Sequence, residues 1–261
     1  MIIDYISDLH IDTWNITIET FIEKVFKNKK SDYLIIAGDT SSFIKNTKDF
    51  LKKLSPLYKS IFIVMGNHDL YQEIHKGKHY NTFLKKYELL KKELSFDNVV
   101  FLDGQLITIE DKVISGLSMW YSEDYIQDKK LFERYWYSFM LDSRETSSFQ
   151  DSFNFYENQV LKLEKIADNK IDLFCSHVKP LINDEYFADK YKHSSVNTFF
   201  CFNGEKYIKN IRHWIFGHTH DQKDFKHKGV RFLCNPLGYP NENKRVTDIF
   251  ISNGFLKQIE I

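Results

Sequence analysis

The hydrophobic pattern of the N-terminal part alternates between short apolar runs and longer amphipathic stretches. The short runs end at turn residues, which predicts strands over residues 2–6, 33–37 and 61–65. In the longer stretches apolar residues recur at every third or fourth position, which predicts helices over residues 18–28, 50–58 and 80–94. This part of the chain therefore follows a β-α-β-α-β-α order.

Strand signals dominate the remainder of the chain. A meander of short strands is predicted over residues 99–102, 106–110 and 112–116, with its first turn at residues 103–104. Further strands are predicted over residues 171–175, 213–216, 230–234, 246–251 and 255–261. The Asn-Gly pair at residues 253–254 is a strong hairpin signal between the last two.

Two sheets packed face to face, with helices outside them, would satisfy both patterns and give an α/β protein. We expect a single domain over residues 1–261, because no repeat or flexible linker interrupts the chain. Residues 119–163 are dense in aromatic and charged side chains. This segment, here called the aromatic insertion, is predicted to form a helical insertion or cap between strands.

Charge and cysteine content narrow the function classes. Lys and Arg together number 36, as do Asp and Glu, so the net charge lacks the basic excess typical of nucleic-acid binders. The three cysteines are widely spaced, which favours reduced thiols in a cytoplasmic protein over a disulfide framework. The N-terminus lacks the basic start of a signal peptide, and no apolar run approaches the ~18 residues of a membrane span.

Metal-ligand side chains follow five of the predicted strands. They are Asp8 and His10, Asp39, the run Asn67-His68-Asp69, His177, and the pair His218 and His220. Parallel strands gather their carboxyl ends at one edge of a sheet, and residues i and i+2 of an extended chain share a side. The side chains should therefore converge on a mixed nitrogen and oxygen site, which suits Mn, Fe, Zn or Ni better than a thiolate metal.

Each motif alone is common, and the ordered set carries the inference. Asp8-x-His10, Gly38-Asp39, Gly66-Asn67-His68-Asp69, His177 and Gly217-His218-x-His220 together resemble the calcineurin-like metallophosphoesterase superfamily. The phrases Cys-Asn-Pro-Leu-Gly-Tyr-Pro at residues 234–240 and Gly-Leu-Ser-Met-Trp at residues 116–120 resemble a bacterial and phage branch of it. The resemblance implies a four-layer α/β/β/α sandwich. It also implies two divalent metals, with Mn preferred. One metal would be held by Asp8, His10 and His220, and the other by Asn67, His177 and His218. Asp39 would bind both.

The resemblance implies hydrolysis of a phosphoester by a metal-activated hydroxide. His68 would lie beside the substrate and stabilise the transition state or protonate the leaving oxygen. Asp69 would either orient His68 or serve as a structural turn carboxylate. The sequence Gly-Asp-Thr-Ser-Ser at residues 38–42 lacks the Asp-Arg-Gly of protein phosphatases, which favours small phosphodiesters or phosphomonoesters such as nucleotides as substrates.

Substrate contacts and competing functions stay open in the sequence. Trp120 and Tyr239 could contact the substrate, and packing or turn roles are the alternatives for both. The expected partner is a small phosphorylated molecule, without a membrane. A nuclease on DNA or RNA is the alternative function, which zero net charge disfavours. A non-catalytic scaffold on the same fold ranks last, because every ligand position and His68 are present.

Overall fold

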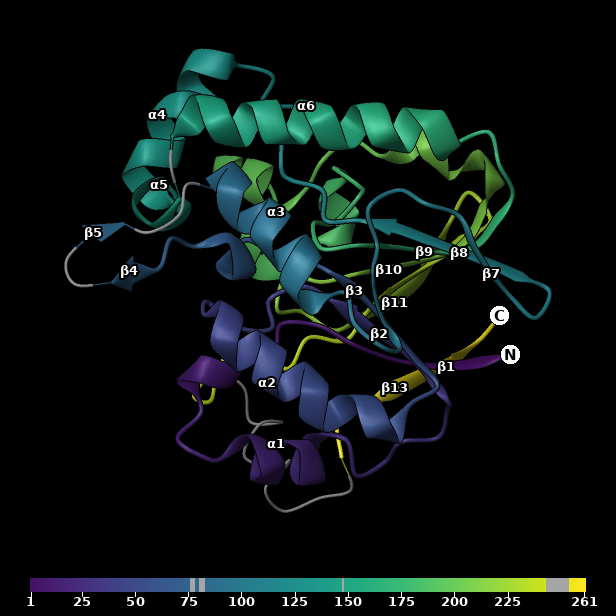
Figure 1. Cartoon of the computed structure of the whole chain (residues 1–261). Helices are drawn as coiled ribbons and strands as arrows, with labels where there is room; N and C mark the ends of the chain where they lie inside the picture. The colour runs from purple at the N-terminus through teal and green to yellow at the C-terminus, as the bar shows by residue number, and fades with distance from the viewer. Residues whose placement is uncertain (76–77, 80–82, 147, 243–253) are drawn as a thin grey trace.

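The computed structural model describes residues 1–75, 78–79, 83–146, 148–242 and 254–261. Its first sheet has the strand order β13-β1-β2-β3-β6. The strands are β1 (Ile2–Ile6), β2 (Tyr33–Ala37), β3 (Ser60–Val64), β6 (Val99–Phe101) and β13 (Lys257–Glu260). The first four run parallel, and β13 pairs antiparallel with β1 at the edge. The two ends of the chain consequently lie side by side (Figure 1).

The second sheet has the strand order β11-β12-β10-β9-β8-β7. Its strands are β7 (Ile107–Ile109), β8 (Lys112–Leu117), β9 (Ile171–Ser176), β10 (Ile211–Phe216), β11 (Lys223–His227) and β12 (Val230–Cys234). The central strands are parallel, and each edge is closed by an antiparallel hairpin. A short separate ribbon joins β4 (Ile74–His75) and β5 (Lys78–His79).

Helices cover both outer faces of the sheet pair (Figure 1). α1 (Ile18–Val25), α2 (Ile44–Leu54) and α3 (Phe83–Leu94) pack beside one another along the first sheet. The aromatic insertion contributes α4 (Lys129–Phe139), α5 (Asp142–Glu145) and most of the long α6 (Phe149–Ile166) on the other side. The result is the α/β/β/α sandwich that was expected. Among the described residues, no helix is long and apolar enough to cross a membrane.

The core between the sheets follows the period of two that strands impose. Alternate residues of each strand point inward, including Ile3 and Tyr5, Phe62 and Val64, and Leu173 and Cys175. The intervening residues face the helices and join a second apolar core. Both faces of the central strands are thus buried, which explains their nearly continuous apolar sequence.

Two predicted elements differ from the structure, and one strand was not predicted. The meander is wrong, because β6 pairs with β3 in the first sheet whereas β7 and β8 form a hairpin in the second. Turn residues mark where a strand ends but do not select its partner. Helix α2 starts at Ile44 instead of residue 50, because its first turns are polar and lack an apolar repeat. Strand β11 was missed for the same reason, since Phe225 is its single apolar residue.

The remaining predicted strands agree with the structure within a few residues. The strand predicted over residues 246–251 and Asn253 of the hairpin signal lie outside the described residues. Residues 257–260 of the final predicted strand form β13 and pair with β1.

Because β3 is buried between the sheets, shortening one of its inward-facing side chains should destabilise the fold strongly. Phe62→Ala should lower the free energy of unfolding by about 3–5 kcal/mol, because the side chain is fully buried and leaves a cavity. Phe43, which is 49% exposed, provides the control, and Phe43→Ala should change stability by no more than about 0.5 kcal/mol. Denaturant unfolding checks both values, and equal effects would contradict the assigned core.

Candidate metal centre

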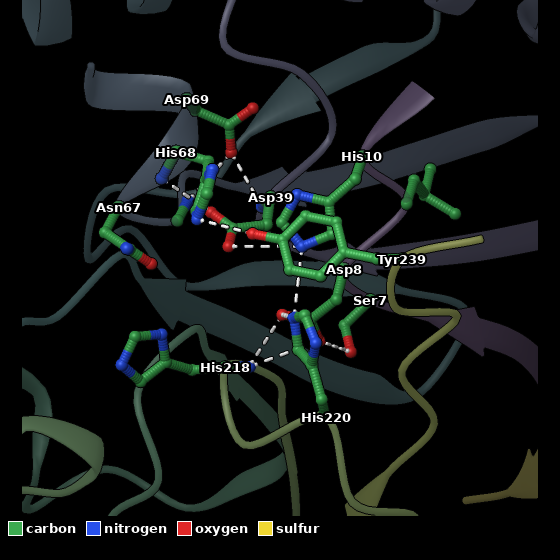
Figure 2. Close-up of polar contacts among 12 residues, drawn as sticks. Ser7, Asp8, His10, Asp39, Asn67, His68, Asp69, His218, His220 and Tyr239 are labelled. Atoms are coloured by element: carbon green, nitrogen blue, oxygen red, sulfur yellow. Dashed lines mark hydrogen bonds and ion pairs between the residues drawn. The ribbon is translucent and has the colours of Figure 1, made fainter. Parts of the chain in front are cut away.

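The predicted metal ligands converge at the carboxyl ends of five strands. Asp8 and His10 follow β1, Asp39 follows β2, and Asn67 follows β3. His177 follows β9, and the pair His218 and His220 follows β10. Figure 2 shows side chains from both sheets turned toward one another. The carboxyl ends of the two sheets therefore meet at one locus, as the strand order implied.

Two groups of potential ligands share one residue. Asp8, His10, Asp39 and His220 can each place a ligand atom within 4.8 Å of the others, and so can Asp39, His177 and His218. The Oδ2 atom of Asp39 lies 3.8 Å from His10 Nε2 and 3.5 Å from His177 Nε2. Asp39 thus stands between the two groups, where a bridging carboxylate would have to be.

The amide of Asn67 completes the second group. Its Oδ1 atom lies 3.2 Å from His177 Nε2. In the first group, His10 Nε2 and His220 Nε2 face each other at 3.1 Å, and Asp8 Oδ1 lies 3.5 Å from His220 Nε2. Imidazole nitrogens, carboxylates and an amide oxygen form a donor set that fits divalent Mn, Fe, Zn or Ni.

Left-handed backbone aims several ligands at this locus. Asp8, His10, Asp39, His218 and His220 all have positive φ, between 42° and 68°. The expectation that Asp8 and His10 share a side of an extended strand is therefore wrong, because the strand has ended and tight left-handed turns direct both. Asp and His are among the residue types that tolerate this conformation, and such strain concentrates at functional sites.

Glycines 38 and 66 allow two of these loops to approach closely. A Cβ atom on Gly38 would lie 2.4 Å from His177 Nδ1, and one on Gly66 would lie 2.0 Å from Asp39 Oδ1. Gly38 also has a φ of 85°, which other residues rarely adopt. Glycine is thus needed before Asp39 and Asn67 because a side chain there would collide with neighbouring atoms, in addition to the sharp turn of the backbone.

Backbone carbonyl groups orient two of the imidazoles. His177 Nδ1 donates to the carbonyl of Ala37 at 2.8 Å, and His218 Nε2 donates to that of Phe199 at 2.8 Å. Each bond fixes the ring and leaves the other nitrogen free for a metal. Burial holds the pKa of His218 at about 4, so this ring presents a neutral, ligating nitrogen. Burial likewise lowers the pKa of His10 to about 4.

Buried carboxylates raise the pKa values of the other two imidazoles. Burial disfavours the charged form, yet Asp39 raises the pKa of His177 to about 9. Hydrogen bonds to Asp8 and Glu242 likewise raise the pKa of His220 to about 10 against its burial. The same pairings hold the pKa of Asp8 at about 2 and that of Asp39 well below its usual range, although both are buried. Asp8 and Asp39 therefore keep their negative charge although they are buried, and carboxylates in this state can bind cations.

Sequence reasoning missed Glu242, which supports a predicted ligand. Its Oε2 atom lies 2.6 Å from His220 Nδ1 and also accepts from the backbone N–H of Tyr239. This contact fixes the His220 ring with Nε2 toward the centre. Glu242 sits in a polar, motif-free stretch, so only its position beside His220 reveals the role.

His68 lies beside the centre without joining either ligand group. Its ring is 4.6 Å from that of His10, and its Nε2 atom lies 3.0 Å from the hydroxyl of Tyr239 and 3.4 Å from that of Tyr71. Tyr239, which also stacks on His10 with ring centroids 4.3 Å apart, is thus placed at the site. Figure 2 shows Tyr239 alongside both rings.

Asp69 and Trp120 have the surroundings of the structural role that the sequence left open for each, rather than those of a catalytic or substrate-binding residue. The carboxylate of Asp69 is fully buried and accepts hydrogen bonds from the backbone N–H groups of Asp39, Thr40, Ser41 and Gly66. It therefore ties the loops after β2 and β3 together, whereas Tyr239 and Tyr71 are the groups near His68 Nε2. Trp120 is buried against Tyr121 and Phe155, which makes it a packing residue of the aromatic insertion rather than a substrate contact.

A cavity of about 580 Å³ opens beside the centre. One wall consists of site residues, among them Asp39, His68, His218 and Tyr239. The other walls are mainly apolar side chains, namely Met140, Leu141, Tyr186, Phe187, Tyr191, Val196 and Phe200. Met140 and Leu141 belong to the aromatic insertion, which thus shapes the approach to the site.

Comparison with known proteins identifies the family. A family model of calcineurin-like phosphoesterases matches residues 1–222. The chain therefore belongs to the calcineurin-like phosphoesterase family, as its ordered motifs predicted.

Individual relatives extend this likeness over nearly the whole chain. The uncharacterized protein L509 of Acanthamoeba polyphaga mimivirus is 26% identical over 269 residues, which cover 92% of each chain. Among solved structures, the phosphopantetheinyl hydrolase PptH of Mycobacterium tuberculosis aligns with a TM-score of 0.75 at 16% identity, covering 98% of this chain and 95% of that one. A dimetal phosphatase of Danio rerio aligns with a TM-score of 0.42 at 12% identity, covering 90% of this chain and 86% of that one.

The contacts of Asp69 predict a structural effect for its substitution. Asp69→Asn should lower the free energy of unfolding by about 1–3 kcal/mol, because an amide nitrogen would face backbone N–H groups that need an acceptor. Metal binding should weaken with it, since the same loops carry Asp39 and Asn67. Thermal unfolding and metal titration check this. Unchanged stability with reduced turnover alone would instead support a role in orienting His68.

Proposed function

We propose that this protein is a metal-dependent hydrolase of small phosphodiesters or phosphomonoesters, such as nucleotides, with a two-metal centre. One cation would be held by Asp8, His10 and His220, the other by Asn67, His177 and His218, and both by Asp39. The observation that supports this most directly is that the two ligand groups share Asp39. Two bound cations would neutralise the phosphoryl group and activate a water for attack, and Mn is the metal we propose.

His68 is proposed as the proton-transfer residue. It lies beside the ligands, lines the cavity, and keeps its Nε2 atom within 3.0 Å of the Tyr239 hydroxyl. A ring in this position can reach the leaving oxygen of an ester whose phosphoryl group sits on the metals. The Tyr239 and Tyr71 hydroxyls would hold that ring in place before the substrate arrives.

The cavity supports a small organic ester as the substrate. Its apolar walls suit an uncharged aromatic or aliphatic group, and its volume is that of an ordinary small-molecule site. Lys223 is the single Lys or Arg among its described lining residues, and it pairs with Asp221 at 2.6 Å. A nucleic-acid polymer would need repeated phosphate contacts, so a nuclease is the less supported alternative.

Hydrolysis should require the metals. Chelator-stripped protein should lose turnover and regain it with Mn, measured on a chromogenic phosphodiester and on its monoester. A nucleotide panel and a phosphopantetheine ester should follow, the latter because the like-folded M. tuberculosis protein is a phosphopantetheinyl hydrolase. The isosteric variant Asp39→Asn tests the shared ligand, and it should lower the metal affinity of both sites. Two bound metals without turnover on any of these esters would contradict the proposal.

Loss of His68 should separate catalysis from metal binding. His68→Ala should lower kcat by about 10²–10⁴-fold, the usual contribution of general acid–base catalysis. Both metals should remain, because His68 belongs to neither ligand group. Steady-state kinetics together with metal analysis of the same preparation check this. Full activity in the variant would refute the assignment.

A further inference from the structure

A buried carboxylate of the aromatic insertion reaches the metal centre. Asp142 lies in α5 and is fully buried. Its Oδ1 atom accepts from Asn67 Nδ2 at 2.8 Å and from the Tyr71 hydroxyl at 2.7 Å. Its Oδ2 atom accepts from the Tyr121 hydroxyl at 2.6 Å. Three neutral donors thus surround a buried acidic group at the edge of the site.

These contacts determine which way the Asn67 amide faces. A carboxylate offers no hydrogen, so the NH₂ end of Asn67 must point to Asp142 and its oxygen to the opposite side. That oxygen lies 3.2 Å from His177 Nε2. Because His177 Nδ1 donates to the Ala37 carbonyl, Nε2 is the ring atom that faces the Asn67 oxygen. These two atoms would be the ligand atoms that a cation at the second site meets.

We propose that Asp142 is a positioning residue of the metal centre, which fixes the Asn67 amide with its oxygen toward the second metal. This inference rests on the proposed two-metal site and adds a requirement to it. The aromatic insertion would then complete the centre as well as wall the cavity, so the second site would be fully formed only when α5 is docked.

The same carboxylate also reaches the surroundings of His68. The Tyr71 hydroxyl that donates to Asp142 lies 3.4 Å from His68 Nε2, and Tyr71 and His68 rings are 4.4 Å apart. Tyr121, the third donor, accepts in turn from Trp136 Nε1 at 2.8 Å, which anchors the cluster in α4. Asp142 is therefore held from the insertion side and acts on the centre through Asn67 and Tyr71.

A swap of donor and acceptor tests the proposal. Asp142→Asn places a second amide opposite Asn67, and Asn67→Asp places two carboxylates about 2.8 Å apart. The double variant Asn67→Asp/Asp142→Asn restores one acceptor and one donor, and keeps an oxygen for the metal. Mn titration of chelator-stripped protein, with metal counted by elemental analysis, gives both Kd values. This readout does not depend on turnover, so it stands even if no substrate is hydrolysed.

We expect Asp142→Asn to weaken the second Mn site about 10- to 100-fold, the usual effect of disturbing a hydrogen-bond partner of a ligand, because one amide oxygen and an NH₂ group replace two oxygens that serve three donors. The first site should change little, and the double variant should recover most of the loss. Wild-type Mn affinity in Asp142→Asn, or a double variant no tighter than Asp142→Asn, would overturn the proposal.

Controls separate positioning from folding. Asp172 is a buried carboxylate away from the centre, where it accepts from the Val113 N–H at 3.0 Å. Asp172→Asn should lower thermal stability while both Mn sites keep their affinity. If Asp142→Asn does not fold, the double variant alone tests the proposal. A folded double variant with two Mn supports the proposal, and one that stays unfolded or binds a single Mn overturns it.

Discussion

The carboxylate of Asp39 is the constraint on which the rest of the site depends. It belongs to both ligand groups, and its Oδ1 atom accepts from the His68 N–H at 2.8 Å. One buried group thus lies where the loops after β1, β2, β3 and β9 meet. Burying a carboxylate is costly unless charges and hydrogen bonds compensate it. The imidazoles and loop amides around Asp39 provide that compensation, and cations would complete it.

Close approach of the loops follows from this concentration of ligands. Residues at positions 38 and 66 must lack a Cβ atom, because His177 and Asp39 occupy the space where one would be. Asp69 then joins the two loops by accepting four backbone N–H groups. Asp39, one of the ligands with left-handed backbone, is held by this network rather than by regular strand pairing. The rigid sheet pair beneath supplies the fixed ends from which the loops start.

The aromatic insertion supplies part of the surroundings of the candidate metal centre. Met140 and Leu141 line the cavity, while Asp142, the next residue, binds Asn67. One short segment therefore contacts both the cavity and the side chain of a candidate ligand. A family fold fixes the position of the phosphoryl chemistry, whereas such an insertion can vary the accepted ester.

The sequence alone determined most of the strands and the first three helices in their order, and it indicated the candidate ligands at the strand ends. Those features are local, since an apolar run, a glycine and a polar residue report on one stretch of backbone at a time. Their combination was sufficient to indicate the family and its two-sheet architecture.

Only the tertiary structure decided which strands pair and which side chains contact one another. The sheet to which β6 belongs depends on pairing with β3, a choice that no turn signal encodes. The roles of Asp69, Trp120, Glu242 and Asp142 likewise depend on what each side chain meets after folding. Asp142 and Asn67 are 75 positions apart, and no periodic pattern links them. Local pattern reflects backbone preference and burial, whereas a hydrogen bond between distant residues exists only once the packed elements bring its two atoms together.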